Sequence, residues 1–296
     1  MNSMILSLAL LPTTSANGHE VSIFYRWKEI FVAGYLIQFL QYTFTAGLAF
    51  LIFYALMRRF FSGRKIQAVF PRSADVRREI VYSLQSLAVF AAVGVLSSVL
   101  ERLHWAQIYY HIHLYGWGYF FFSIVALIVL HDTWFYWTHR ALHWRPLFRL
   151  AHRVHHQSHN PTPWAAFAFH PIEALIEALI YPAAILVLPI HPLAALAWLL
   201  YMTVMNVGGH LGFELCPPGF ARHRLFRWHN TSVHHNMHHS HIHCNYGLYF
   251  NIWDRLMGTN HAKYEEYFDQ VVVSAGNSVT SLPVLPATKL ENNQSF

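Results

Sequence analysis

The chain has 296 residues, of which 55% are hydrophobic and only 11% are charged, and its mean hydropathy is +0.28. Soluble domains carry roughly 25% charged residues, so this composition excludes an ordinary soluble protein and indicates an integral membrane protein. Basic residues beside membrane helices account for the net charge of +6. No glycine-rich phosphate loop or RNA-binding signature points to a nucleic-acid partner, and the two cysteines form no C-x-x-C motif.

Four apolar runs are long enough to cross a bilayer, whose hydrocarbon core takes about 20 helical residues. They cover residues 30–57, 80–100, 115–137 and 172–207. The last run is nearly twice as long as one crossing needs, and three prolines interrupt it, so we expect a helical hairpin that turns near residues 188–192. The sequence thus predicts an all-α integral membrane protein with four to five transmembrane helices, arranged largely as hairpins.

The distribution of basic residues predicts the orientation of these helices. Residues 58–78 contain seven lysines and arginines, whereas residues 101–114 contain one. The positive-inside rule therefore puts residues 58–78 in the cytoplasm and residues 101–114 outside. Counting the crossings from there puts residues 139–170 and 210–261 on the cytoplasmic side. The plasma membrane and the endoplasmic reticulum both fit this multi-pass topology.

Three short histidine strings lie in these two cytoplasmic stretches, with the patterns H-x-x-x-H, H-x-x-H-H and H-x-x-H-H. Their histidines are His139, His143, His152, His155, His156, His235, His238 and His239. Residues three and four apart share one face of a helix, so we expect each string to point its imidazoles the same way. Imidazole is the commonest nitrogen ligand of iron, zinc and copper. Eight such ligands are too many for one ion and suit two.

Further ligand candidates lie near the strings. His210 and Glu214 are four residues apart, and we expect His210 to be a ninth ligand. His131, which precedes the first string by eight residues, and His170 are weaker candidates, as is Glu214, which could instead anchor a ligand histidine. Asp132 is either an acceptor for a ligand N–H group or a charge at the membrane interface. No catalytic residue beyond the metal ligands is predicted.

Histidine-rich, thiolate-free ligation of two ions suits non-haem iron that activates oxygen. A site at the membrane boundary can reach a methylene group of a lipid, and breaking such a C–H bond needs an oxidant that side chains do not supply. Two alternatives remain open. A membrane zinc hydrolase would more typically contain H-E-x-x-H, a string that does not occur here. A metal-binding or transport protein would place its polar ligands near the bilayer midplane.

Residues 131–259 resemble the sterol desaturase / fatty acid hydroxylase superfamily of membrane histidine-box di-iron enzymes. The resemblance is carried by the segments HDTWFYWTHRALH, HRVHHQSHNPTPWAAFAFHP and HHNMHHSHIHCNYGLYFNIWDRLMGT, a little under half of the chain. Residues 161–171 look most like those of sterol C-5 desaturases. The resemblance implies a cytoplasmic-face, helical, histidine-rich metal domain whose two ions are held by the eight histidines of the strings. In some members a further ligand pair falls where His210 and Glu214 stand, although its second position is Glu here.

The resemblance also implies two iron ions (or zinc after purification), molecular oxygen, no bound haem or flavin, and hydroxylation or desaturation of a lipid. Sterols, fatty acyl chains, sphingoid bases and isoprenoids are the lipid classes that it allows. Electrons would come from an external cytochrome b5-like or ferredoxin-like donor, since we expect no fused electron carrier. The predicted divisions are an N-terminal segment (residues 1–29), N-terminal membrane helices (30–114), a fatty acid hydroxylase-like catalytic domain (115–262) and a partly disordered C-terminal tail (263–296).

Overall fold

The structure, a computed structural model, describes residues 23–274. In this range the elements are helices joined by loops, and β-structure is limited to three isolated bridges. Four helices are long and apolar enough to cross a membrane: Arg26–Leu56, Ser73–Arg102, Gly116–Leu142 and Pro192–Gly209. The chain is therefore an all-α multi-pass membrane protein, as predicted from its composition.

The first three membrane helices cover the predicted apolar runs to within one residue, and each extends beyond its run at one end or both. The first helix, α2 (Ile23–Phe50), continues through the π-helical segment η1 (Leu51–Leu56). The next two are α3 (Ser73–Arg102) and α4 (Gly116–Leu142). Helices are held by backbone hydrogen bonds and do not need an apolar side chain at every position. For this reason α4 continues past the run that ends at residue 137 and carries the first histidine string beyond it.

The fourth run forms the predicted hairpin, with an interruption in its first arm. This arm consists of α6 (Pro171–Ala178) and α7 (Ile180–Val187), and the second arm is α8 (Pro192–Gly209). Pro182 has no N–H group to donate to the carbonyl of residue 178, so the helix is interrupted at Leu179. This interrupted arm packs against α3 and α4.

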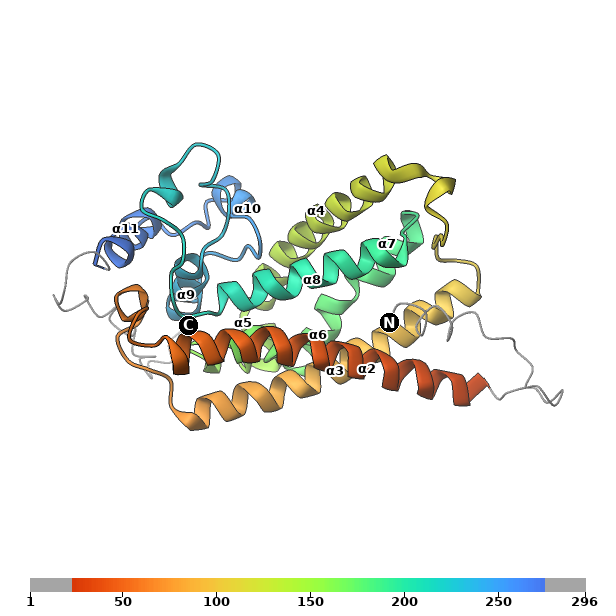
Figure 1. Ribbon diagram of the computed structural model, residues 1–296, viewed down its shortest axis with the longest axis horizontal. Helices are drawn as coiled ribbons and strands as arrows, with labels where there is room; N and C mark the ends of the chain where they lie inside the picture. The colour runs from red at the N-terminus through yellow and green to blue at the C-terminus, as the bar shows by residue number, and fades with distance from the viewer. Residues whose placement is uncertain (1–22, 275–296) are drawn as a thin grey trace.

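Shorter helical segments complete the fold and lie mostly at one end of the bundle. They are η2 (Ser62–Arg64), η3 (Ile112–Leu114), α5 (Arg145–Leu147), η4 (Phe148–His152), η5 (His155–Gln157), η6 (Pro163–Phe167), η7 (Phe220–Arg222), α9 (Ser232–His241), α10 (Ile252–Leu256) and α11 (Tyr264–Ser274). Figure 1 shows α9, α10 and α11 together at the left-hand end of the long helices. Helices α4 and α8 both stop at this end, which we call the histidine end.

The basic connection between α2 and α3 lies at the histidine end as well. Lys65 forms a β-bridge with Phe213, and the Ile66 N–H group donates to the carbonyl of Gly212 at 3.1 Å. At the opposite end, the loop after α3 pairs with the hairpin turn through Ile108 and Ile190. The arginine-rich connection and the loops that carry the histidine strings are therefore on the same side of the bundle.

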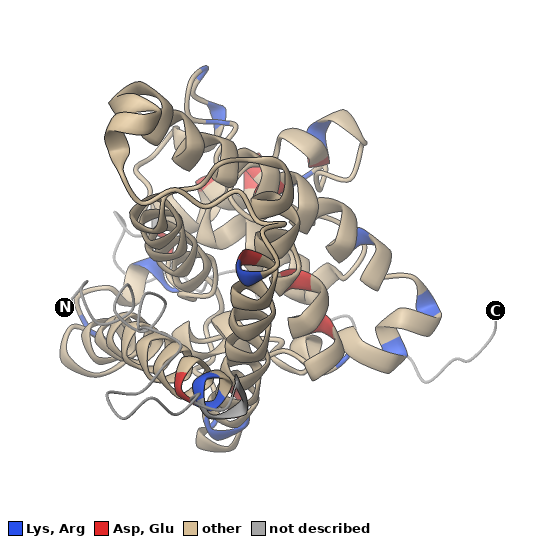
Figure 2. Ribbon diagram, turned by 90° about the vertical axis from the view of Figure 1, so that its right-hand side faces the viewer, with Lys and Arg blue, Asp and Glu red and all other residues tan. Residues whose placement is uncertain are grey.

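The outer surface of the long helices is apolar. Leu40 on α2 is 63% exposed, Phe121 on α4 is 59% exposed and Val204 on α8 is 58% exposed. Figure 2, which looks along the bundle, shows few charged residues on the helices. Soluble proteins rarely expose contiguous apolar surface of this kind, whereas a bilayer solvates it. These side chains therefore face lipid.

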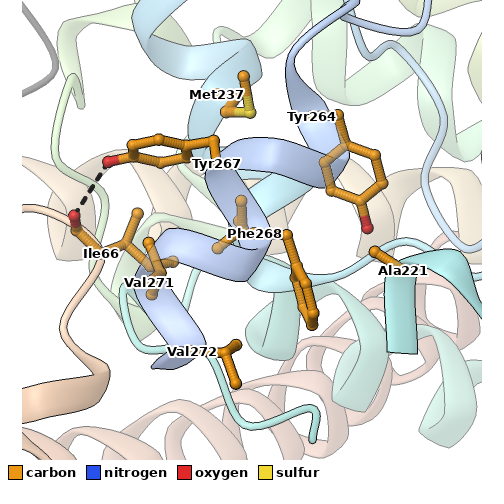
Figure 3. Packing of buried hydrophobic residues seen from close by; sticks show 9 residues of the cluster. Ile66, Ala221, Met237, Tyr264, Tyr267, Phe268, Val271 and Val272 are labelled. Atoms are coloured by element: carbon orange, nitrogen blue, oxygen red, sulfur yellow. Dashed lines mark hydrogen bonds between the residues drawn. The ribbon is translucent and has the colours of Figure 1, made fainter. Parts of the chain in front are cut away.

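A separate hydrophobic cluster holds α9 at the histidine end. Phe268 and Val271 of α11 pack with Met237 of α9 and with Ile66 (Figure 3). The Tyr267 hydroxyl donates to the Ile66 carbonyl at 3.2 Å and ties α11 to the connection between α2 and α3. Residues of the segment that we assigned to the tail, from Tyr264 to Val272, thus belong to this cluster. The polar stretch after it, expected to be disordered, lies outside the described residues.

Candidate metal centre

Nine buried histidines meet at the histidine end, and four segments supply them. The end of α4 supplies two, η4 and η5 supply three, the residue after α8 supplies one and α9 supplies three. They are His139, His143, His152, His155, His156, His210, His235, His238 and His239. These are the nine positions selected from the sequence as the main ligand candidates, and the fold brings all of them together. Their role as metal ligands stays a prediction.

The nine imidazoles divide into two groups, and within each group the candidate ligand atoms lie within 4.8 Å of one another. The five-histidine group consists of His139, His143, His152, His156 and His238. The four-histidine group consists of His155, His210, His235 and His239. The groups adjoin, since the ring centroids of His156 and His239 are 5.2 Å apart. The arrangement offers two neighbouring sites, as the number of histidines had indicated.

The second and third strings each supply both groups, which differs from the expectation that one string points all its rings the same way. On α9, His235 and His239 belong to one group and His238 to the other. At 3.6 residues per turn, positions four apart differ by about 40° in direction, whereas the position three along lies about 60° to the other side. A two-sided stripe of this kind can face two adjacent sites. The second string is not one α-helix, because it passes from η4 into the 3₁₀ turn η5.

Backbone carbonyls determine which nitrogen carries hydrogen on two rings of the five-histidine group. His139 Nδ1 donates to the Tyr246 carbonyl at 2.8 Å, and His238 Nδ1 donates to the Cys244 carbonyl at 2.6 Å. A carbonyl oxygen can only accept, so the hydrogen of each neutral ring is on Nδ1. The Nε2 atom therefore carries a lone pair and no hydrogen. These lone pairs face the Nε2 atoms of His152 and His156, each at 3.1 Å.

The four-histidine group repeats this arrangement around His210. Its Nδ1 donates to the Asn206 carbonyl at 2.8 Å, which leaves a lone pair on Nε2. The Nε2 atoms of His235, His239 and His155 lie 3.0, 3.3 and 3.4 Å from it. The lone pair on His210 Nε2 can accept a hydrogen from only one of these three neighbours. The other Nε2 lone pairs then face one another, unless a cation lies among them.

The spacing of these nitrogen atoms fits metal coordination. For metal–nitrogen bonds of about 2.0–2.1 Å, ligand atoms lie about 3.0 Å apart at a right angle and about 3.4 Å apart at a tetrahedral angle. The closest Nε2 pairs, at 3.0–3.4 Å, fall in this range. Neither group contains cysteine or carboxylate, and an all-imidazole donor set suits iron, zinc or copper better than magnesium or calcium.

Burial keeps the imidazoles in the neutral form that binds metal. Desolvation, followed by the neighbouring imidazoles, holds the pKa values of six of them well below the usual value: His152, His155, His156, His235, His238 and His239. Burial also lowers the pKa of His143, and it lowers that of His210 to about 4. At neutral pH these groups therefore offer lone pairs without first having to lose a proton.

Buried carboxylates that the sequence analysis missed support the histidines. Glu173 accepts from His152 Nδ1 at 2.6 Å. Asp254 accepts from the N–H groups of Tyr246 and Gly247, both at 2.8 Å, and so holds the loop whose carbonyls orient His139 and His238. A possible signal was their rarity, because the chain has only 14 acidic residues and an ionised carboxylate in an apolar setting needs a partner.

The weaker candidates and Asp132 have other contacts. His131 Nδ1 is 2.7 Å from the Tyr249 hydroxyl, and His170 caps α6 by accepting from the Ile172 N–H group. Glu214 accepts from the Val233 N–H group at the start of α9, where a carboxylate stabilises the helix terminus. Asp132 does not bind a ligand N–H group, because its carboxylate accepts from the backbone of residues 249 and 250. All four lie outside the two groups.

Comparison with known proteins gives matches over the part of the chain that carries the histidines. The model of the fatty acid hydroxylase family matches residues 124–259. A lathosterol oxidase of Rattus norvegicus is 32% identical over 188 residues, which are 62% of this chain and 61% of that protein. A Delta(7)-sterol 5(6)-desaturase of Aspergillus fumigatus is 26% identical over 258 residues, 80% of this chain and 79% of that protein.

The chain therefore spans about 61% of the length of the rat protein. No solved structure matches it significantly. The residues that match the family model include all nine histidines of the two groups. These histidines lie at one end of the bundle of membrane helices. Over these residues the chain is thus similar to the fatty acid hydroxylase family and to sterol desaturases.

Proposed function

We propose that this chain is a membrane-bound oxidoreductase that uses two iron ions, molecular oxygen and external electrons to desaturate or hydroxylate a lipid. The observation that carries the proposal is the pair of all-histidine groups at the end of a membrane bundle. An oxygen-dependent lipid oxidase needs a metal centre that lies within reach of the bilayer, and this arrangement supports such a centre.

The relatives favour a sterol-like lipid as substrate. Lathosterol oxidase and Delta(7)-sterol 5(6)-desaturase are named for sterols, and the resemblance of residues 161–171 points to the same class. We therefore propose desaturation of a polycyclic or isoprenoid lipid as the first activity to test, with hydroxylation as the alternative outcome. The catalytic domain is proposed to be residues 115–262.

The histidines would hold the ions, five in one group and four in the other, and bound iron would supply the oxidising power for an unactivated C–H bond. The chain itself would position the ions and the lipid and would keep water away from the metal site. Phe135 packs 4.9 Å from His139, Phe169 packs 5.0 Å from His155 and Tyr246 packs 5.0 Å from His143, as measured between ring centroids. These buried aromatic rings keep water away from the imidazoles and offer apolar contacts to a lipid.

The redox balance requires a partner. Desaturation removes two hydrogen atoms from the lipid, and reduction of one dioxygen to two waters takes four electrons, so two electrons and two protons must come from elsewhere. Hydroxylation has the same requirement. We propose a cytochrome b5-like or ferredoxin-like protein as the donor.

We propose that the histidine end is cytoplasmic, because the arginine-rich connection between α2 and α3 shares that end. Single cysteines at exposed positions test this orientation after Cys216 and Cys244 have been replaced. In intact cells, Gln107→Cys should react with an impermeant thiol reagent, and Ser62→Cys should react only after permeabilisation. The reverse pattern would contradict the orientation, and labelling of both from one side would contradict the separation of the two ends.

The decisive experiment is lipid analysis of membranes that contain the chain, a reductant and sterol-type lipids, with labelled dioxygen or under anaerobic conditions. We expect an oxygen-dependent product whose mass is lower by two hydrogens and which carries no label. A labelled product heavier by one oxygen would identify a hydroxylase. An unchanged anaerobic rate would contradict the proposal and favour the zinc hydrolase.

A further inference from the structure

The two histidine groups differ in the charge behind their rings. Glu173 lies against the five-histidine group through its hydrogen bond with His152. Among residues 23–274, only two histidine–carboxylate pairs lie within 4.0 Å: His152 with Glu173, and His234 with Asp254. Neither pair includes a histidine of the four-histidine group. One group therefore has an anionic partner, and the other has none at this distance.

The surroundings of Glu173 make its charge significant. Its side chain is 3% exposed and that of His152 is 1% exposed. No lysine or arginine in the described range forms an ion pair with Glu173, and its second oxygen, Oε2, has no hydrogen-bond partner. A buried carboxylate of this kind is costly unless a positive charge compensates it. A dication held by the five-histidine group would provide that charge.

The hydrogen bond also determines how His152 can act. A histidine that binds a metal through Nε2 carries its hydrogen on Nδ1. Glu173 Oε1 lies 2.6 Å from His152 Nδ1, so it is placed to accept this hydrogen. The contact orients the ring, keeps the lone pair on Nε2 and increases the basicity of that nitrogen.

We infer that Glu173 is a positioning residue that makes the five-histidine group the tighter of two unequal metal sites. This inference rests on the proposed di-metal function. Its consequence is an order of loading, in which the five-histidine group fills first and the four-histidine group loses its ion first. Removing the charge of Glu173 should bring the two affinities closer together.

The chain offers a matched control on the same helix. Glu177 lies one turn after Glu173 on α6, is also buried, and has an Oε2 atom without a hydrogen-bond partner. Its Oε1 atom accepts from the Thr138 hydroxyl at 2.9 Å and not from a histidine. Glu177→Gln thus removes a buried charge close to the centre without altering the His152 contact. Because Gln keeps the shape of Glu and an acceptor oxygen, both variants preserve packing.

The experiment measures metal directly. The full chain in nanodiscs is loaded with ⁵⁷Fe(II) under anaerobic conditions and titrated with a chelator, and metal per chain is determined by mass spectrometry. We expect two-phase release from the wild type. In Glu173→Gln the tighter phase should weaken by about 10–100-fold, the usual effect of losing a partner behind a ligand. In Glu177→Gln both phases should stay within about 2-fold of the wild type.

A second readout on the same samples separates positioning from general damage. Mössbauer spectra of the loaded wild type should contain two iron signals of equal area, and Glu173→Gln should change one of them. A wild type that holds fewer than two metals would overturn the di-metal proposal and this inference together. Two metals with single-phase release, or equal weakening by both variants, would overturn the inference and leave the proposed function intact.

Discussion

Alanine in place of one histidine from either group is expected to abolish lipid oxidation and to remove one metal ion per chain. His156 represents the five-histidine group and His235 the four-histidine group. Both are buried, and each loss removes a nitrogen that no nearby side chain replaces. Activity should fall below detection for both variants, because the two ions act as a unit. Metal per chain, measured after size-exclusion chromatography, should fall from about two to about one.

The control is His159→Ala, three residues after His156 on the exposed surface. It lies outside both groups, so metal content and activity should match the wild type. Retention of two metals and full activity after loss of either buried histidine would contradict the assignment of that group. An equal loss in His159→Ala would indicate that the assay reports general instability.

The second large effect is expected at Asp254, which touches no histidine of either group. Its carboxylate accepts from the N–H groups of Tyr246 and Gly247 and from the Thr259 hydroxyl, at 2.7–2.8 Å. Asp254→Ala leaves these buried donors without an acceptor, at about 1–3 kcal/mol each. The loop should then release the carbonyls that orient His139 and His238. We expect lower thermal stability and loss of metal from the five-histidine group.

Thermal unfolding followed by tryptophan fluorescence, together with metal per chain, checks this expectation. Asp269→Asn is the comparison, because Asp269 pairs with Arg222 on the surface, where an ion pair contributes about 0–1 kcal/mol. An Asp254→Ala protein with both metals and unchanged thermal stability would show that the loop does not need this carboxylate.

The helices were predictable because lipid imposes a simple rule on sequence. Any segment that crosses must be long, apolar and internally hydrogen-bonded, and this rule located the four helices that are long and apolar enough to cross, as well as the hairpin. The ends of the helices were less predictable, since α3 begins at Ser73 and α4 continues to Leu142. Neither boundary coincides with the end of an apolar run, and backbone hydrogen bonding does not require that it should.

The histidines could be identified from their spacing, but their division between two sites could not. The helix period groups residues that share a face, whereas the division depends on which neighbouring segment each ring meets. His155 and His156 are adjacent in the chain and enter different groups, because one meets His210 and the other meets His238. The supporting carboxylates depend on contacts as distant as Asp132 with residue 249, and no local pattern encodes these.

The short second arm of the hairpin has a consequence for the bilayer itself. Helix α8 has 18 residues, which at 1.5 Å per residue is about 27 Å, whereas the hydrocarbon core of a typical bilayer is about 30 Å thick. Helix α3, with 30 residues, exceeds that thickness. Thinning of the bilayer beside α8 is one response to such hydrophobic mismatch, and we expect it here. His210 directly follows α8, so acyl chains should be shortest, and headgroups closest to the midplane, next to the four-histidine group.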